Sequence, residues 1–303
     1  MYMFGSLFQG GLHMNFRDFL LNLQSIRNYE DKNIESPVLN DIKGYLNELN
    51  TTVGKEKGFS FILLEDGAEV FEKLEGIGGY SGVMIKSPHY IGLKLSNDKA
   101  ETEFLGAYFM QSVVKKLFDL GLGSCWVNIR NISINTKKEL LNNENANINY
   151  LLAFGKADEK ALKEKSQSIY VQNISTSPYG YKIIEEKGMD NARLAVSEIV
   201  YLDEWGNKAS YDELESRGVA DIFFFVRNAP SYKNMQPCRF ILKAGEALLA
   251  IVEPQNIENY VDAGIMMYTA EGLAKDLGIP AKWSFIEDGE NNKEYKVVAR
   301  MSL

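Results

Sequence analysis

The order of apolar and polar residues along the chain predicts a mixed α+β protein. Apolar residues that recur every three to four positions indicate a helix with one buried face, and short apolar runs between turn residues indicate strands. The expected helices are residues 14–23, a segment with Ser36 as N-cap and Pro37 as its first residue, 101–120, a short helix capped by Asn135, 190–201, and 211–226. The expected strands are residues 59–64, 90–95, 148–154, 240–242 and 248–252.

A glycine-rich segment, residues 76–82, resembles a loop that binds dinucleotide phosphates. Such a loop must follow a strand and open a helix. Here a charged helical segment precedes the glycines, and the apolar residues 83–85 follow them. The segment is therefore interpreted as a flexible turn, which we call the glycine turn.

Two long parts of the chain resemble each other in sequence. The helix that ends at Gly121 aligns with the helix that ends at Gly278, an offset of 157 residues. Residues 59–63 align with 238–242, and residues 150–153 align roughly with 295–299. Coincidence between similar helix-turn-strand segments is one explanation, and two copies of one α+β unit is the other. The charged stretch after the first copy places the boundary between an N-terminal half, 14–160, and a C-terminal half, 161–303.

Composition limits the classes of partner. The chain has 303 residues, of which 45% are hydrophobic and 24% charged, as is ordinary for a globular protein. A formal net charge of −8 argues against a broad surface for nucleic acid or an anionic membrane, and no run approaches the roughly 18 apolar residues of a membrane span. Residues 1–13 are interpreted as an expression leader, because Leu-Phe-Gln-Gly within them resembles part of a protease-site tag.

Cysteine and histidine are both scarce. Cys125 and Cys238 do not make a disulfide framework, and a reducing, cytoplasmic location is expected. The only histidines are His13 and His89, so the sequence predicts no zinc cluster, no other metal site and no catalytic side chain. Cys125 is interpreted as an inert buried thiol, and His89 as a packing or surface residue.

A polar stretch with two prolines, residues 227–240, joins a predicted helix to a predicted strand. Pro230 cannot lie inside the helix, so the helix must end before it. Ser231, Asn234 and Gln236 then follow at short spacing with few charges. Such side chains can direct donors and acceptors at the edge of a neutral, planar ligand. Composition alone leaves a surface turn equally open.

The order Ala-Pro-Ser-x-x-Asn-x-Gln-Pro in residues 229–237, which we call the Pro-Ser loop, closely resembles a motif of the FMN-dependent nitroreductase family. Residues 25–29, 122–126 and 262–265 carry the resemblance further, and it covers nearly all of 14–303. The family is usually homodimeric, with each flavin site built from both subunits. A subgroup that resembles this chain holds both halves in one polypeptide. The resemblance therefore implies a nitroreductase-like α+β fold, with two tandem halves forming an intramolecular pseudo-dimer.

The same resemblance implies which residues bind FMN. Ser25 and Arg27 would bind the phosphate, since a guanidinium can hold two phosphate oxygens. Leu23 and Gln24 replace basic or polar residues of the family. Backbone N–H groups of a strand would approach the flavin ring and stabilise charge on it. The full expected set is Ser25, Arg27, Trp126, Val127, Asn128, Ile129, Lys163, Lys165, Pro230, Ser231, Tyr232, Asn234 and Gln236.

Several of these assignments have alternatives. Trp126 fits a core residue as well as a flavin neighbour, and the lysines at 163 and 165 fit a solvated tether as well as a phosphate site. Cys238 stands where the family usually has tryptophan. The Ser-Ile-Arg segment occurs only in the first half and the Pro-Ser loop only in the second, its counterpart being residues 51–55. One complete site per chain is therefore expected, and a second, dead one.

The resemblance implies an FMN-dependent oxidoreductase that takes hydride from NADH or NADPH and reduces a nitroaromatic, quinone or similar small-molecule acceptor. Flavin supplies this chemistry, so no side-chain acid or base is required. A monomer with an internal pseudo-dimer is expected, with neither a nucleic-acid nor a membrane partner. A non-catalytic FMN-binding or flavin-sensing protein is the alternative, and a structural relic without flavin is a third possibility.

Overall fold

The structure is a computed structural model that describes residues 15–97, 99–160, 193–286 and 289–303. The interpreted leader, the predicted boundary after residue 160, Lys163 and Lys165 lie outside these ranges.

The N-terminal half is built on a four-stranded antiparallel sheet with the order β1-β2-β4-β3. Its strands are β1 (Phe59–Leu64), β2 (His89–Leu95), β3 (Gly123–Asn128) and β4 (Ile148–Gly155). Its helices are α1 (Phe16–Asn22), α2 (Ser36–Leu49), the π-helix η1 (Asn50–Gly54), α3 (Lys55–Lys57), α4 (Gly67–Leu74), α5 (Ala100–Asp119), α6 (Ile134–Leu141) and the 3-10 helix η2 (Asn143–Asn145).

The C-terminal half is built on a five-stranded sheet with the order β5-β6-β7-β9-β8. Its strands are β5 (Val200–Leu202), β6 (Cys238–Lys243), β7 (Glu246–Val252), β8 (Trp283–Phe285) and β9 (Tyr295–Ser302). All pairings are antiparallel except β5 with β6, which is parallel. Its helices are α9 (Val196–Ile199), α10 (Tyr211–Ser216), α11 (Ala220–Val226), the 3-10 helix η3 (Tyr232–Asn234) and α12 (Glu258–Asp276).

The two halves repeat one topology, which confirms the internal repeat. The order β6-β7-β9-β8 reproduces β1-β2-β4-β3, and the same strand pair is irregular in both, at Leu93/Lys94 and at Leu249/Ala250. The long helices α5 and α12 end alike, each followed by a left-handed glycine, Gly121 (φ 73°) and Gly278 (φ 75°). The predicted offset of 157 residues therefore holds for these helices.

One part of the predicted alignment is wrong. The irregularity places Tyr150 opposite Leu93 and Ala299 opposite Leu249. Tyr150 therefore corresponds to Ala299 and not to Tyr295, because register in a sheet is set by strand pairing.

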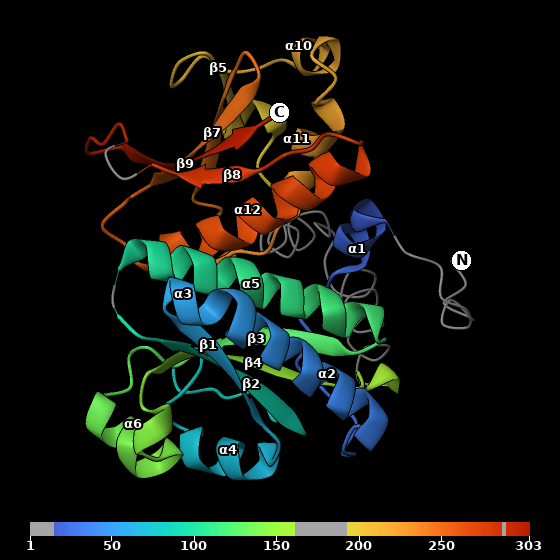
Figure 1. The fold of residues 1–303 in the computed structure, drawn as a ribbon, viewed down its shortest axis with the longest axis vertical. Helices are drawn as coiled ribbons and strands as arrows, with labels where there is room; N and C mark the ends of the chain where they lie inside the picture. The colour runs from blue at the N-terminus through green and yellow to red at the C-terminus, as the bar shows by residue number, and fades with distance from the viewer. Residues whose placement is uncertain (1–14, 98, 161–192, 287–288) are drawn as a thin grey trace, which may run out of the picture.

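Helices α5 and α12 lie side by side between the two sheets and join the halves (Figure 1). A methyl group on Gly264 would lie 2.3 Å from the carbonyl oxygen of Phe104 and 2.9 Å from the Cβ of Ala107. Only glycine permits this approach. Ala107 and Gly264 are equivalent at the offset of 157, and contact between equivalent positions marks a twofold axis. The halves are therefore related as the subunits of a symmetric dimer are.

The start of the first half contacts the second half, whereas strand β5 pairs within its own half. Helix α1 packs on α12: the Phe16 ring lies 5.4 Å from that of Tyr268, and the Phe16 N–H donates to Asp276. Strand β5, which precedes the rest of the second half, pairs with β6. The largest hydrophobic cluster draws residues from both halves, so the chain has one shared core.

Four local expectations differ from the structure. The predicted helix 211–226 is two helices, α10 and α11, which Gly218 (φ 71°) separates. Within the predicted helix 190–201, Val200 begins strand β5, because it pairs with Phe240. Glu35 and not Ser36 is the N-cap of α2, and Ser133 and not Asn135 caps α6. The glycine turn is confirmed as a turn between α4 and β2.

Candidate functional site

Strand β3 organises the predicted site of the first half. Ser25 forms a parallel bridge with Ser124, and the Ile26 N–H donates to the Ser124 carbonyl at 3.0 Å. The Tyr29 hydroxyl hydrogen-bonds the carbonyls of Ile26 and Ala153 at 2.7 and 3.0 Å. These bonds hold the Ser-Ile-Arg segment beside the first residues of β3.

Arg27 lines an open cavity of about 760 Å³ at the start of α4. Its lining carries three basic side chains, Arg27, Lys32 and Lys86, and five acidic ones, Glu30, Asp31, Glu65, Asp66 and Asp158. An acidic lining does not suit a phosphate dianion. Burial raises the pKa of the neighbouring Cys125 thiol, and the charge of Arg27 opposes that shift. The guanidinium can therefore also act toward the start of β3.

The far end of β3 contains the predicted ring-binding residues. Val127 and Ile129 are buried in a cluster on one side of the sheet. Trp126 faces the other side, where its ring lies 6.1 Å from that of Tyr150. Among the described residues, no hydrogen-bond partner reaches the buried indole Nε1 of Trp126. A buried donor without an acceptor is costly, so this side of β3 fits a ligand that supplies an acceptor.

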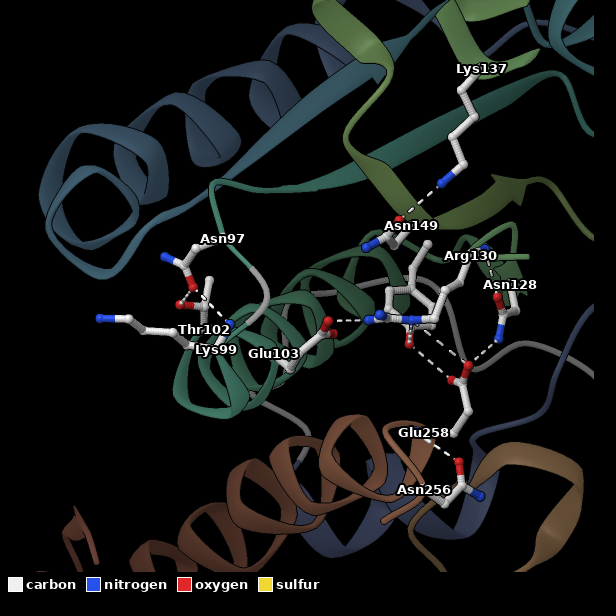
Figure 2. Close-up of polar contacts among 11 residues, drawn as sticks. Asn97, Lys99, Thr102, Glu103, Asn128, Arg130, Lys137, Asn149, Asn256 and Glu258 are labelled. Atoms are coloured by element: carbon white, nitrogen blue, oxygen red, sulfur yellow. Dashed lines mark hydrogen bonds and ion pairs between the residues drawn. The ribbon is translucent and has the colours of Figure 1, made fainter. Parts of the chain in front are cut away.

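Charged and polar side chains join the end of β3 to the second half (Figure 2). Glu258, at the start of α12, accepts hydrogen bonds from Asn128 Nδ2 at 2.7 Å and from the Tyr150 hydroxyl at 2.9 Å. Arg130 donates to the fully buried Glu103 and, at 3.1 Å, to Tyr150. This network fixes β3 against α12 through Asn128, and so positions the predicted site at the junction of the halves.

The Pro-Ser loop lies over the start of α12. The Tyr232 N–H donates to both carboxylate oxygens of Asp262, at 2.9 and 3.1 Å, and the Gln236 N–H donates to Ser231 Oγ at 3.0 Å. Three non-glycine residues have left-handed backbones: Lys233 (φ 50°), Asn234 (φ 56°) and Gln236 (φ 49°). Such strain persists only where surrounding contacts impose it, and it gathers at functional sites.

Arg193, which sequence reasoning missed, holds the loop from the inside. Its guanidinium donates to Asn234 Oδ1 at 2.8 Å, to the Ala229 carbonyl at 3.2 Å and to the Asn228 carbonyl at 3.3 Å. The Leu194 N–H donates to Gln236 Oε1 at 2.9 Å. The amide oxygens of Asn234 and Gln236 thus accept hydrogen bonds from Arg193 and Leu194, and Gln236 Nε2 donates to the Asn234 carbonyl at 3.2 Å, so these side chains hold the loop in its conformation.

Asp262 is a buried carboxyl group beneath the loop. Burial raises its pKa to about 8, and the Tyr232 N–H partly opposes that shift. Asp262, Arg227 and Ser231 are among the residues that line a cavity of about 10 Å³, room for a single water. Asp262 and Arg193 therefore both hold the loop: Asp262 accepts from a backbone N–H group, and Arg193 donates to oxygen atoms of the loop and of the residue before it.

The loop reaches the first half next to β3. Lys233 Nζ lies 4.8 Å from the ring centre of Tyr80 in the glycine turn, and the Gly79 N–H donates to the Asn128 carbonyl at 3.0 Å. The structure thus brings the Pro-Ser loop to the end of β3, while Ser25 and Arg27 lie toward its beginning. Neither of the two cavities described above is lined by both Arg27 and Asn234.

Other chemistry is limited in the part of the chain that the structure describes. No group of three or more histidine, cysteine or acidic residues there could hold a metal ion, and no helix there could cross a membrane. Both cysteines are buried and free. His89 is buried, and it accepts from the Ile34 N–H and hydrogen-bonds the Glu65 carbonyl, so it is a packing residue.

Two equivalent α+β halves share a helical interface within one chain, so the fold is that of a tandem pseudo-dimer. The family model described as "Putative TM nitroreductase" matches residues 20–199. The chain therefore belongs to this nitroreductase family, and the resemblance stated from its sequence is confirmed.

One of three similar solved structures agrees with this chain at the level of the fold. A protein from Thermotoga maritima described as "a putative nitroreductase" has 16% identity and a TM-score of 0.56, and the match covers 98% of this chain and 97% of that one. An FMN-dependent nitroreductase from Clostridium difficile has 24% identity, a TM-score of 0.37, and coverage of 46% and 86%. An FMN-dependent nitroreductase from Mycobacterium smegmatis in complex with NADPH has 12% identity, a TM-score of 0.39, and coverage of 50% and 91%. No curated protein matches.

Proposed function

We propose that the chain is an FMN-dependent NAD(P)H oxidoreductase with one cofactor site at the junction of its halves. The observation that carries the proposal is the contact of the Pro-Ser loop with the glycine turn, between Lys233 and Tyr80. The glycine turn in turn bonds the end of β3, through the Gly79 N–H and the Asn128 carbonyl. Membership of the nitroreductase family supports the reaction class. The unused Trp126 donor on the same strand supports a ligand there.

The chain's residues would divide the work of holding FMN. Ser25 and Arg27 would hold the phosphate, with Lys163 and Lys165 as further cations, and the backbone of Trp126 to Ile129 would lie along the ring. Pro230, Ser231, Tyr232, Asn234 and Gln236 would approach from the other half. When bound, FMN accepts hydride from a nicotinamide and delivers two electrons to an acceptor.

The overall reaction balances without a side-chain acid. NAD(P)H and one proton from solvent convert a quinone to a hydroquinone and leave NAD(P)⁺. The protein's part is to bind, to orient and to stabilise negative charge with fixed N–H groups. Nitroaromatics are acceptors of the same kind, because they also take up electrons and protons.

We further propose that the protein acts as a monomer in the cytoplasm, with halves divided near residue 160. The α5–α12 interface, which two subunits would otherwise form, lies within the chain. Two free, buried cysteines suit a reducing compartment. Light scattering of the purified protein at several concentrations should give the mass of one chain, and a stable dimer mass would contradict the monomer.

The visible spectrum of the protein as isolated tests the proposal. We expect flavin absorbance that bleaches when NADH or NADPH is added without oxygen and returns when a quinone or nitroaromatic is added. A colourless protein that FMN does not restore would overturn cofactor binding.

A non-catalytic FMN-binding or flavin-sensing protein is the second candidate. The contact between Tyr80 and Lys233 favours it, since this contact bridges the halves beside β3 and would restrict the approach of a nicotinamide. Flavin that is retained but stays oxidised with both nicotinamides would select this candidate over the enzyme.

A further inference from the structure

One lysine lies between two tyrosine rings where the halves meet. Lys233 Nζ is 4.8 Å from the ring centre of Tyr80 in the first half and 5.1 Å from that of Tyr232 in the second. Both distances are within the range of a cation–π contact. We call these three residues the Tyr-Lys-Tyr clamp.

The clamp lies among large apolar side chains that face solvent. On the glycine turn and its end, Ile77, Tyr80 and Val83 are 48%, 64% and 70% exposed, and Met235 of the Pro-Ser loop is 61% exposed. Single exposed apolar residues are common, but these four stand on two loops that touch through Tyr80 and Lys233, and we call the four the apolar patch. Such a patch, with one cation inside it, fits a small aromatic molecule that carries a negative charge.

The two loops are held in place before any ligand arrives. In the glycine turn, a methyl group on Gly79 would lie 2.1 Å from the Val83 carbonyl, and one on Gly82 would lie 2.6 Å from the Gly76 carbonyl. Asp262 anchors Tyr232 on the other side. Because their ordering is already complete, little conformational entropy remains to be lost on binding.

We propose that the Tyr-Lys-Tyr clamp selects aromatic ligands with an anionic substituent, such as carboxylated or sulfonated quinones and nitroaromatics. This inference rests on the proposed function and names the class of acceptor. The ring of the ligand packs against Tyr80 and the apolar patch, and its anionic group pairs with Lys233. The adenosine phosphate of NADPH also combines an aromatic ring with an anionic group. The experiments below therefore separate binding of the acceptor from binding of NADPH.

Calorimetric titration of the purified full chain with benzoate and with benzamide tests the inference, since neither probe is reduced. We expect benzoate to bind several times more tightly than its neutral analogue. Lys233→Met should raise the Kd of benzoate about five-fold and leave that of benzamide unchanged. Lys243→Met, at the exposed last residue of β6, is the matched control and should change neither dissociation constant.

Tyr80→Phe and Tyr80→Leu separate the aromatic face from the hydroxyl group. Phenylalanine keeps the face and should keep the benzoate affinity, whereas leucine should lower it about three-fold. Raising the salt from about 0.05 M to about 0.5 M should weaken benzoate alone. Equal affinity for the two probes, or an equal effect of both lysine substitutions, would overturn the inference.

Steady-state kinetics then show whether the clamp binds the acceptor or the phosphate of NADPH. They also separate a failure of the clamp proposal from a failure of the proposed oxidoreductase function. If the clamp recognises the acceptor, Lys233→Met raises the KM for nitrobenzoate and leaves the NADPH to NADH ratio unchanged. A change in that ratio alone would overturn the assignment to the acceptor. Benzoate binding through Lys233 in a protein that no nicotinamide reduces would overturn the proposed function and leave the anion preference intact.

Discussion

The two halves differ in the segment that leads into their equivalent strands, β1 in the first half and β6 in the second. In the first half the chain stays helical through α2, η1 and α3, and enters β1 after the left-handed Gly58 (φ 79°). In the second half α11 stops at Val226, and the Pro-Ser loop follows. At equivalent positions of the repeated topology, the first half thus has a continuous helical segment and the second half has a polar, strained loop.

The difference extends to how each sheet edge is completed. Asn50 in the first half donates to the Phe61 carbonyl at 2.9 Å and accepts from its N–H at 2.7 Å. The equivalent Phe240 pairs instead with Val200 of β5. The Asn50 side chain and strand β5 each provide hydrogen-bond partners for backbone groups at the edge of a sheet. Without partners, these groups could pair with another chain and cause aggregation. Only strand β5 frees the preceding loop to carry ligand-binding groups, which is consistent with a single site per chain.

Asp262 offers the strongest test of the difference between the halves. Its equivalent in the first half, at the offset of 157, is Leu105, so only the second half has a carboxyl group at this position. The pKa of Asp262 is raised to about 8 from 3.8. A raised carboxyl pKa means that its contribution to stability is fully present below about pH 4 and is lost as pH rises to about 8. Asp262→Asn should remove that loss, on the order of 5 kcal/mol as an upper bound.

Denaturant unfolding at several values between pH 4 and pH 8 measures the loss for the wild type and for Asp262→Asn. Asp212→Asn, on an exposed turn of α10, should keep the wild-type slope. Parallel pH profiles for the wild type and Asp262→Asn would show that the group does not titrate in this range.

Gly264→Ala should give the next largest effect, since it acts on the interface itself. The added methyl group meets backbone at 2.3 Å, which should destabilise the protein by about 3 kcal/mol. The matched control is Gly44→Ala in α2, which meets no atom within 4 Å and should stabilise the helix by up to about 1 kcal/mol. Thermal unfolding measures the change in Tm of each variant. Equal changes in Tm for Gly264→Ala and Gly44→Ala would contradict the close packing of α5 on α12.

Arg193→Ala should release the Pro-Ser loop and leave the first half unaffected. Loss of its charged hydrogen bonds should cost about 2 kcal/mol and lower FMN affinity, because the loop would no longer be ordered before binding. Flavin fluorescence titration measures the affinity. Arg217→Ala, at the exposed end of α10, is the control. Unchanged affinity in Arg193→Ala would show that the loop orders without this anchor.

Asn50→Ala should give the smallest effect and weaken only the edge of the first half. Loss of its two bonds to Phe61 should cost about 1 kcal/mol without changing the visible spectrum. Hydrogen exchange at the Phe61 amide should rise, whereas Thr51→Ala should leave it slow. A change in flavin binding in Asn50→Ala would contradict the assignment of this segment to structure alone.

The sequence predicted most elements whose pattern is local. Strand β1 matches its predicted range, β4 differs by one residue at one end, and α5 differs by one residue at each end. Errors arose where distant residues decide. Val200 is a strand residue because Phe240 lies beside it, and no local pattern shows that. The break at Gly218 was hidden by apolar residues on both sides of it.

The sequence predicted which segments belong to the candidate site, but it did not predict how they are arranged in space. The family resemblance located the Pro-Ser loop and β3, and the structure brings the two together. Arg193 was missed because a single arginine in a polar stretch carries no pattern, and its role depends on carbonyls more than thirty residues away. Three of the acidic residues around Arg27, namely Glu65, Asp66 and Asp158, likewise come from segments that are distant in sequence.

The contact between Ala107 and Gly264 has an evolutionary consequence. In a homodimer, a substitution at the axis appears on both sides at once, so alanine would have to face alanine. Two copies within one chain are free of that constraint, and this chain has alanine, the better helix former, on one helix and glycine on the other. Each copy could then specialise, one supplying a strand and the other a loop, without any need to preserve a duplicate.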